Sequence, residues 1–253
     1  MQNINLSAVI LTKDSEVYIK NCLRSLSFAD EKIVIDDYST DKTVEIAKKY
    51  GAKIYKRNLS GDFATQRNYG LGKARGKWIF FVDSDEIIPP DLKSEIVQAI
   101  NNPFVGTDGF YLKRLDNIWG KTLKHGETGN IKFLRLAKKD GGLWYRKVHE
   151  VWKVAGQART LNVPILHLPH QTLHEFIDDI NMMSDIDVRA KIDEKKRSSL
   201  QKIIFWPVGK LVWNWKFRLG FLDGTQGMVM ALMMSFHSFL SWSKLWMNQK
   251  HSH

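Results

Sequence analysis

The chain has 253 residues, of which 38 are lysine or arginine and 27 are acidic, and its formal net charge is +11. A hydrophobic content of 43% excludes a disordered chain, and the length suits one large α/β domain with an appendage. The single cysteine, Cys22, excludes an internal disulfide and favours a reducing compartment. The basic charge suits nucleic acid, an anionic membrane or phosphorylated substrates, so its position along the chain has to discriminate between these partners.

The first hundred residues alternate between predicted strands and predicted helices. Apolar, β-branched runs predict strands at residues 7–12, 32–36, 53–56 and 77–83. Capping residues and helical patterns predict helices from residue 14 or 15 onward and at 40–50, 62–74 and 89–100. Strands that alternate with helices imply right-handed crossovers and a mostly parallel sheet.

Polar side chains follow three of these strands at the point where each strand ends. They are Thr12 and Asp14 after the first, Asp36 and Asp37 after the second, and Asp83, Asp85 and Glu86 after the fourth. In a doubly wound sheet such ends gather on one edge, where ligands bind. Two carboxylates spaced i and i+2 can share Mg²⁺ or Mn²⁺, which prefer oxygen ligands and often bridge to phosphate. The pattern therefore favours a nucleoside diphosphate with a metal, and the alternative is a set of solvated acidic turns.

Two common nucleotide-binding loops are missing from the sequence. No Gly-x-Gly-x-x-Gly follows the first strand, and no Gly-Lys-Ser/Thr loop is present, which argues against a dinucleotide oxidoreductase and a P-loop NTPase. Phosphate charge would then be met by metal and by basic residues such as Arg67. No recognised nucleic-acid motif is present, so no nucleic-acid partner is expected.

Four segments in this order and strand context resemble family-2 inverting glycosyltransferases with the GT-A fold. They are residues 8–14 (AVILTKD), 34–43 (VIDDYSTDKT), 66–70 (QRNYG) and 78–86 (WIFFVDSDE). The resemblance covers about residues 6–150. Within the family, the chain looks most like bacterial lipopolysaccharide-core and surface-polysaccharide glucosyltransferases. That branch also has a Val-His-Glu motif, matched at 148–150, and a Phe-Leu-Asp-Gly segment, matched at 221–224.

The resemblance implies a role for each matched donor-side position. Thr12, Asp36 and Asp37 would hold the base and ribose of a nucleotide-sugar, Arg67 would lie near the diphosphate, Asp83 would face ribose or metal, and Asp85 would be the main metal ligand. The family commonly has Asn-Glu where this chain has Asp14-Ser15-Glu16. The carboxylate is kept but displaced, so the donor-binding role of Asp14 depends on the local geometry.

An inverting transfer also needs a base that takes the proton of the acceptor hydroxyl. The Val-His-Glu motif makes Glu150 the expected base, and His149 would orient it, bind phosphate or add a metal ligand. The alternative is a surface pair within the aromatic and basic stretch 144–152.

Residues 104–170 lose the alternation, and short β-like runs are expected at 109–113, 131–136 and 164–168. In GT-A folds this half builds the acceptor side. Its candidate acceptor residues are Trp119, Lys121, His125 and Trp144, whose alternative is a place in the core. A zinc site at His167, His170 and His174 is not expected, because no cysteine or carboxylate stands in register with them.

The last eighty residues change character. A charged helix is expected at 178–197, tryptophans alternate with lysine and arginine at 202–218, and a final helix is expected at 227–247. Such aromatic and basic mixtures suit a membrane interface, whereas the apolar run 228–234 is too short to span a bilayer. The first residues lack the features of a secretory signal. We therefore expect a cytoplasmic protein that lies on an anionic membrane surface, and the alternative is a helical cap on the catalytic domain.

The sequence predicts a GT-A catalytic domain at residues 1–175, with a nucleotide-sugar half at 1–103 and an acceptor half at 104–175, followed by a helical region at 176–253. It predicts a metal-dependent inverting transfer from a UDP-sugar, expected to be UDP-glucose, to a lipopolysaccharide-core or lipid-linked glycan acceptor at the inner face of the cytoplasmic membrane. One alternative is a nucleotidyltransferase, which usually carries a glycine-rich basic loop that is missing here. A non-enzymatic basic membrane-binding protein would leave the acidic cluster 83–86 unexplained.

Overall fold

The computed structural model describes residues 4–129, 131–147, 150–169 and 171–251. The chain divides into two compact units. The first unit combines the residues up to 114 with residues 132–167, and the second combines residues 115–131 with the residues from 168 onward. The predicted boundary at 175 stays a prediction, and the segment 115–131 belongs to the helical unit.

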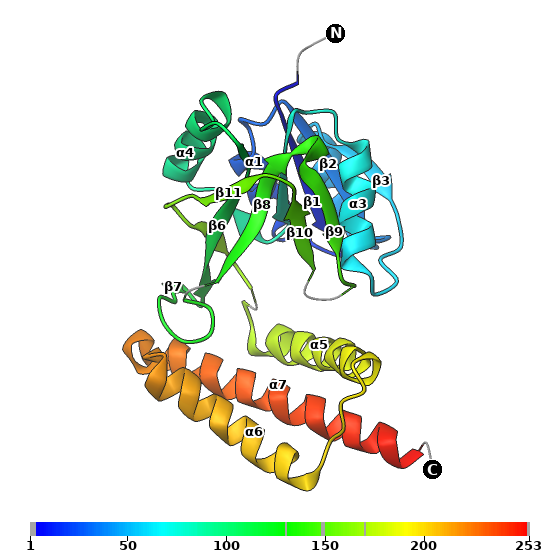
Figure 1. The fold of residues 1–253 in the computed structure, drawn as a ribbon, viewed down its shortest axis with the longest axis vertical. Coiled ribbons are helices and arrows are strands. Elements are labelled where there is room, and N and C mark those ends of the chain that lie inside the picture. Colours follow the sequence, from blue (N-terminus) through cyan, green and yellow to red (C-terminus); the bar gives the residue numbers. More distant parts are fainter. Residues whose placement is uncertain (1–3, 130, 148–149, 170, 252–253) are drawn as a thin grey trace. The chain divides into compact units, whose positions relative to one another are not determined.

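A sheet forms the centre of the first unit (Figure 1). Among the described residues, ten strands are linked in the order β3-β2-β1-β4-β8-β6-β12-β5, with β11 and β7 also paired to β6. The strands are β1 (Leu6–Thr12), β2 (Glu31–Asp36), β3 (Lys53–Lys56), β4 (Trp78–Asp83), β5 (Glu86–Ile87), β6 (Thr107–Ile118), β7 (Lys121–Thr122), β8 (Lys132–Lys138), β11 (Gln157–Thr160) and β12 (Ile165–His167). The first four strands in this order pair in parallel, whereas β8 is antiparallel to both β4 and β6.

Helices of the first unit cover both faces of the parallel strands. They are α1 (Ile19–Ser25), α2 (Thr43–Lys49), α3 (Phe63–Lys73) and α4 (Pro90–Asn101). Successive strand residues point to opposite faces. Accordingly Ala8 and Ile10 of β1 pack with residues of α1 and α4, while Val9 packs with residues of α3. Figure 1 shows α3 and α4 flanking the sheet.

The predicted strands and helices of the first hundred residues are present, and the largest boundary shifts are at the starts of α1 and of α2, which begins at Thr43 rather than at residue 40. Helix α1 begins at Ile19 rather than at residue 14 or 15. Asp14 lies in the left-handed region, with φ of 41°, and a turn precedes the helix. A residue with positive φ cannot lie in a right-handed helix, so Asp14 is part of the turn that precedes α1.

A hairpin of β9 (Gly142–Tyr145) and β10 (Val151–Val154) lies beside the sheet of the first unit. Its residues Trp144 and Trp152 join the core cluster formed with α3 and with Phe81 of β4. A short 3₁₀ helix, Lys139–Gly141, leads from β8 into the hairpin.

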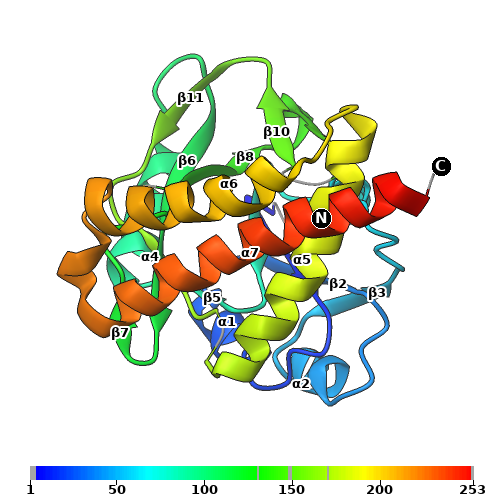
Figure 2. The same ribbon diagram turned by 90° about the horizontal axis from the view of Figure 1, so that it is seen from below.

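The second unit is mainly helical. Its elements are α5 (Leu173–Asp193), α6 (Leu200–Val212), a π-helical turn (Trp213–Phe217), a 3₁₀ turn (Gly220–Asp223) and α7 (Gly224–His251). In Figure 2, α6 and α7 run side by side and α5 crosses α7. The expected helix at 178–197 begins earlier, because Thr172 and Glu175 form a capping box at its start. Among the described residues, no helix is long and apolar enough to cross a membrane.

Candidate active site

The carboxyl ends of three parallel strands meet at one edge of the sheet. Thr12 of β1 lies opposite Asp36 of β2, and Leu11 lies opposite Asp83 of β4. The predicted gathering of these ends is therefore confirmed by the strand register. Thr12, Asp36 and Asp83 stand on neighbouring strands, at the edge where sheets of this kind bind ligands.

Two buried arginines hold Asp83. Arg67 Nη2 donates to Asp83 Oδ1 at 3.0 Å, and Arg135 Nη2 donates to Asp83 Oδ2 at 2.7 Å. The arginine side chains are only 3% and 6% exposed. Burial alone would raise the pKa of Asp83, but the guanidinium groups of Arg135 and Arg67 outweigh it and hold the pKa well below its usual range. Asp83 is therefore an ionised anchor for both arginines.

Arg67 also joins Asp83 to Glu150. Its Nε donates to Glu150 Oε1 at 2.8 Å, so one guanidinium group bridges two carboxylates. The guanidinium carbon lies 4.8 Å from the ring centre of Trp144, a cation–π contact that helps to hold it. The predicted base thus lies at the same edge as the acidic cluster. His149 lies outside the described residues.

Asp85 pairs with His167, for which the sequence had offered no carboxylate partner. His167 Nε2 lies 3.1 Å from Asp85 Oδ2, and His167 lies opposite Glu86 in the antiparallel pairing of β12 with β5. Burial would raise the pKa of Asp85, but His167 outweighs it and lowers the pKa. The Asp85 side chain is 32% exposed, so its carboxylate is accessible to a ligand.

Glu86 stabilises the acidic turn through a buried hydrogen bond. It is fully buried, and its Oε2 accepts a hydrogen bond from the backbone N–H of Asp83 at 2.9 Å. Burial and the neighbouring Asp83 charge raise the pKa of Glu86. Glu86 therefore shapes the turn that presents Asp85.

The donor set fits a divalent cation that shares its coordination with a ligand. Among the described residues, no group of three or more His, Cys, Asp or Glu side chains is arranged to hold a metal alone. Mg²⁺ and Mn²⁺ sites commonly use one or two carboxylates and complete their shell with phosphate oxygens. Asp85 with His167 offers an oxygen and a nitrogen, whereas both oxygens of Asp83 already accept from arginines. The geometry thus favours Asp85 over Asp83 as a metal ligand.

Several buried polar atoms at this edge lack a hydrogen-bond partner among the described residues. They are Thr12 Oγ1, Arg67 Nη1, Glu86 Oε1 and Arg135 Nε. An unsatisfied buried group costs about 1–3 kcal/mol, so most such groups in folded proteins have a partner. Their concentration at one edge indicates that a bound ligand or water completes them.

The remaining predicted donor residues have different local roles. Both oxygens of Asp36 accept from the backbone N–H of Ser39 at 3.2 Å. Asp37 Oδ1 accepts from the backbone N–H of Leu59 at 3.0 Å. Asp14 Oδ1 accepts from the backbone N–H and the hydroxyl of Thr40, which ties it to a neighbouring turn and argues against direct donor binding.

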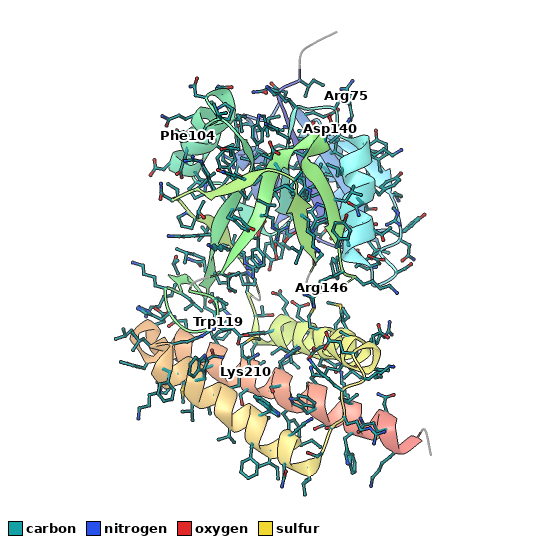
Figure 3. The ribbon with its side chains drawn as sticks, in the orientation of Figure 1. Arg75, Phe104, Trp119, Asp140, Arg146 and Lys210 are labelled. Carbon is teal, nitrogen blue, oxygen red and sulfur yellow. The ribbon has the colours of Figure 1, made fainter. Side chains whose placement is uncertain are left out.

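The predicted acceptor residues fall in both units. Trp144, in the first unit, is 5% exposed and stacks on Trp152 with a ring-centre distance of 5.2 Å, which argues against a ring that faces an acceptor. Trp119, Lys121 and His125 belong to the second unit. Trp119 lies with Gly120 in the turn between β6 and β7, and both residues have positive φ (Figure 3). The role of these three stays a prediction.

The family model described as glycosyl transferase family 2 matches residues 7–153, which is more than half of the chain. The chain belongs to glycosyl transferase family 2. The predicted resemblance, the GT-A fold and glycosyltransferase activity are thereby confirmed. Family membership also decides against the nucleotidyltransferase and the non-enzymatic alternative.

This glycosyltransferase is similar over most of its length to curated relatives. An uncharacterized glycosyltransferase of Rickettsia bellii (strain RML369-C) is 26% identical over 257 residues, covering 95% of this chain and 85% of that protein. The lipopolysaccharide core biosynthesis glycosyltransferase LpsC of Rhizobium meliloti (strain 1021) is 26% identical over 259 residues, covering 98% of this chain and 93% of that protein. Among solved structures, residues 1–349 of S. aureus TarS superpose with a TM-score of 0.48 at 16% identity, covering 99% of this chain and 92% of that one.

Proposed function

We propose that this glycosyltransferase transfers a sugar with inversion from a UDP-sugar, namely UDP-glucose, to an acceptor hydroxyl. The observation that carries the proposal is the bridge that Arg67 makes between Asp83 and Glu150, next to the Asp85–His167 pair. The bridge links the acidic end of β4 to the only carboxylate of the Val-His-Glu motif. The proposed base, Glu150, would thus be held next to the donor-side carboxylate Asp83 through Arg67.

Glu150 is the proposed base. Arg67 holds its Oε1 at 2.8 Å, so Oε2 would accept the proton as the acceptor hydroxyl attacks the anomeric carbon. A base must lie within hydrogen-bond reach of the proton that it takes, and the guanidinium fixes its orientation through a charge-assisted bond. The sugar–phosphate bond breaks on the opposite side, and the nucleoside diphosphate leaves.

Asp85 and His167 would hold Mn²⁺ or Mg²⁺, which would neutralise charge on the departing diphosphate. Asp83 would contribute mainly through Arg67 and Arg135, which it keeps in place at the same edge. Thr12, Asp36 and Asp37 would hold the base and ribose. The unsatisfied Thr12 hydroxyl, buried at the end of β1, supports a ligand at this position.

The proposed acceptor is a lipopolysaccharide-core or other lipid-linked glycan at the inner face of the cytoplasmic membrane. LpsC, named for lipopolysaccharide core biosynthesis, aligns with 98% of this chain. Trp119, Lys121 and His125 remain the proposed acceptor contacts, because aromatic faces suit sugar rings and basic groups suit phosphorylated sugars.

A thermal-shift panel of nucleotide-sugars with and without Mn²⁺ tests the donor and the metal together. Stabilisation grows with ligand concentration relative to the dissociation constant, so UDP-glucose with Mn²⁺ should give the largest shift. Asp85→Ala should lose that shift. Asp91→Ala is the matched control, because Asp91 is an exposed carboxylate at the start of α4. If no UDP-sugar stabilises the protein, or if Asp85→Ala behaves like Asp91→Ala, the proposal fails.

A further inference from the structure

The outer face of α6 is apolar and uncovered. Leu200, Ile204, Val208 and Val212 repeat every four residues, which places them in one row along the helix, and all are exposed. Phe205 lies beside this row and is 68% exposed. A helix at a water-facing surface normally carries polar residues on its outer side, so this face calls for a partner.

The inner side of α6 and the following turn packs against the rest of the second unit. Pro207 and Asn214 are buried, and the Pro207 carbonyl accepts a hydrogen bond from the Ser235 hydroxyl of α7 at 2.8 Å. Asn214 donates to Glu127 at 3.0 Å. The segment is therefore anchored by one side, and its apolar row cannot turn inward.

The apolar surface continues beyond the helix through the π-helical turn and the 3₁₀ turn. Its further exposed members are Trp213, Phe217, Leu219, Phe221 and Leu222, and Trp206 within α6 is also exposed while its ring stacks on Trp242 of α7. Trp213 and Phe217 lie with their ring centres 5.5 Å apart. We call the exposed apolar side chains of residues 200–222 the α6 face.

The charge around the α6 face is mainly positive, although Glu194 pairs with Lys196 and Glu127 pairs with Lys210. Residues 195–222 contain seven lysines and arginines and no acidic residue. They are Lys195, Lys196, Arg197, Lys202, Lys210, Lys216 and Arg218, and Figure 3 labels Lys210 on α6. Apolar rings mixed with cations match a lipid headgroup layer, where tryptophan lies at the interface and lysine or arginine meets anionic lipid.

A second copy of the chain fits this face less well. A twofold interface would place the α6 face against itself, and therefore one net positive patch against another. Like charges facing each other across an interface cost several kcal/mol, whereas an anionic bilayer offers the opposite sign. Since no described helix can span a membrane, the segment would lie along the bilayer surface.

We propose that the α6 face, residues 200–222, docks on an anionic lipid bilayer, with its exposed aromatic and aliphatic side chains against the lipid. The inference deepens the membrane placement in the proposed function, but docking needs neither the sugar donor nor the transfer reaction, so the two can fail separately. It specifies which surface of the second unit meets the membrane and which lipid charge it selects.

Vesicle flotation of the full chain tests the inference. The vesicles are phosphatidylcholine alone, or phosphatidylcholine with about one third phosphatidylglycerol. The parent protein should partition onto the anionic vesicles at least about tenfold more strongly than onto neutral ones, and salt should weaken that binding. Phe205→Ser with Trp213→Ser should reduce the partition on the order of tenfold. Lys216→Glu should weaken binding to anionic vesicles and flatten its salt dependence.

The matched control removes two equally exposed apolar side chains from the first unit. Phe104 and Val105 are 65% and 100% exposed, and Phe104→Ser with Val105→Ser should leave vesicle binding unchanged. Circular dichroism melting establishes that each variant is folded, and donor hydrolysis by the Phe205/Trp213 variant should match that of the parent.

Three results would overturn the inference. The first is no binding of the parent to anionic vesicles at low salt. The second is an equal loss in the Phe104/Val105 control. The third is a parent dimer, seen by sedimentation velocity, that Phe205→Ser with Trp213→Ser converts to a monomer, which would make the face a protein interface.

Discussion

Substitution of Arg67 tests whether its bridge holds the candidate site together. The side chain is 3% exposed and donates to both Asp83 and Glu150. Arg67→Met would leave Glu150 without this partner, and removal of one member of a buried ion pair costs about 3–5 kcal/mol. Arg67→Lys keeps the charge but cannot reproduce two separate donors of a planar fork, so it should lose one charge-assisted hydrogen bond, about 1.5–3 kcal/mol.

Urea unfolding followed by circular dichroism measures these free energies of unfolding, and Arg75→Lys is the control. Arg75 Nε donates to Glu31 at 2.9 Å, but the Arg75 side chain is 59% exposed. An exposed pair contributes about 0–1 kcal/mol, so the control should lose far less than Arg67→Lys. Glu150→Gln in the Arg67→Met background should recover part of the loss, because it removes the unpaired charge. Equal losses in the two lysine variants, or strict additivity in the double variant, would refute the bridge.

Glu150→Gln should keep donor affinity by calorimetry and reduce turnover roughly 10²–10⁴-fold, the usual effect of losing a general base; an unchanged rate would remove Glu150 from the reaction. Burial would raise the pKa of Glu31, but hydrogen bonds from Ser7, Lys53 and Arg75 lower it from 4.5 to about 2. The stability that this depressed pKa provides is present above pH 4.5 and is lost as the pH falls through about 2. After allowance for its exposed partners it amounts to roughly 1–3 kcal/mol. Unfolding midpoints of Glu31→Gln should therefore depend less on pH across that window, and parallel pH profiles would contradict this. Asp223 accepts from the backbone N–H groups of Lys124 and His125 and pairs with the His125 ring. Asp223→Asn should cost about 1–3 kcal/mol and weaken hydrogen-exchange protection at those two amides, and unchanged protection would count against this anchoring role.

The donor edge could be predicted from the sequence because its signals are local. The buried strand β4 and the acidic residues Asp83 and Asp85 at its end lie within eight consecutive residues, 78–85, so the sequence alone shows where the strand stops. Parallel pairing then brings such ends together without further information. Helix starts were less certain, since the left-handed backbone of Asp14 delays α1 to Ile19.

The partners of the acidic cluster were missed because they come from distant strands. His167 reaches Asp85 through the β12–β5 pairing, which joins segments about eighty residues apart. One signal for Arg135 was present, since a single arginine inside the apolar run Phe133–Ala137 has to be paired if it is buried. Trp144 could not be assigned from sequence alone, since an acceptor platform and a core tryptophan look the same there.

The charges at the candidate site give an independent reason to expect a divalent cation. The carboxylates of Asp83, Asp85 and Glu150 are matched by the guanidinium groups of Arg67, Arg135 and Arg114, so little positive charge is left over to meet a diphosphate. Two like charges about 5 Å apart cost about 3 kcal/mol at an effective dielectric constant of about 20. A nucleoside diphosphate would therefore bind poorly without a cation. On this argument Asp85→Ala lowers the repulsion as it removes a ligand, so metal-free UDP affinity should hold or rise while the gain from Mn²⁺ disappears. A purely structural role for Asp85 would reduce both affinities, and calorimetric titration of UDP with and without Mn²⁺ separates the two outcomes.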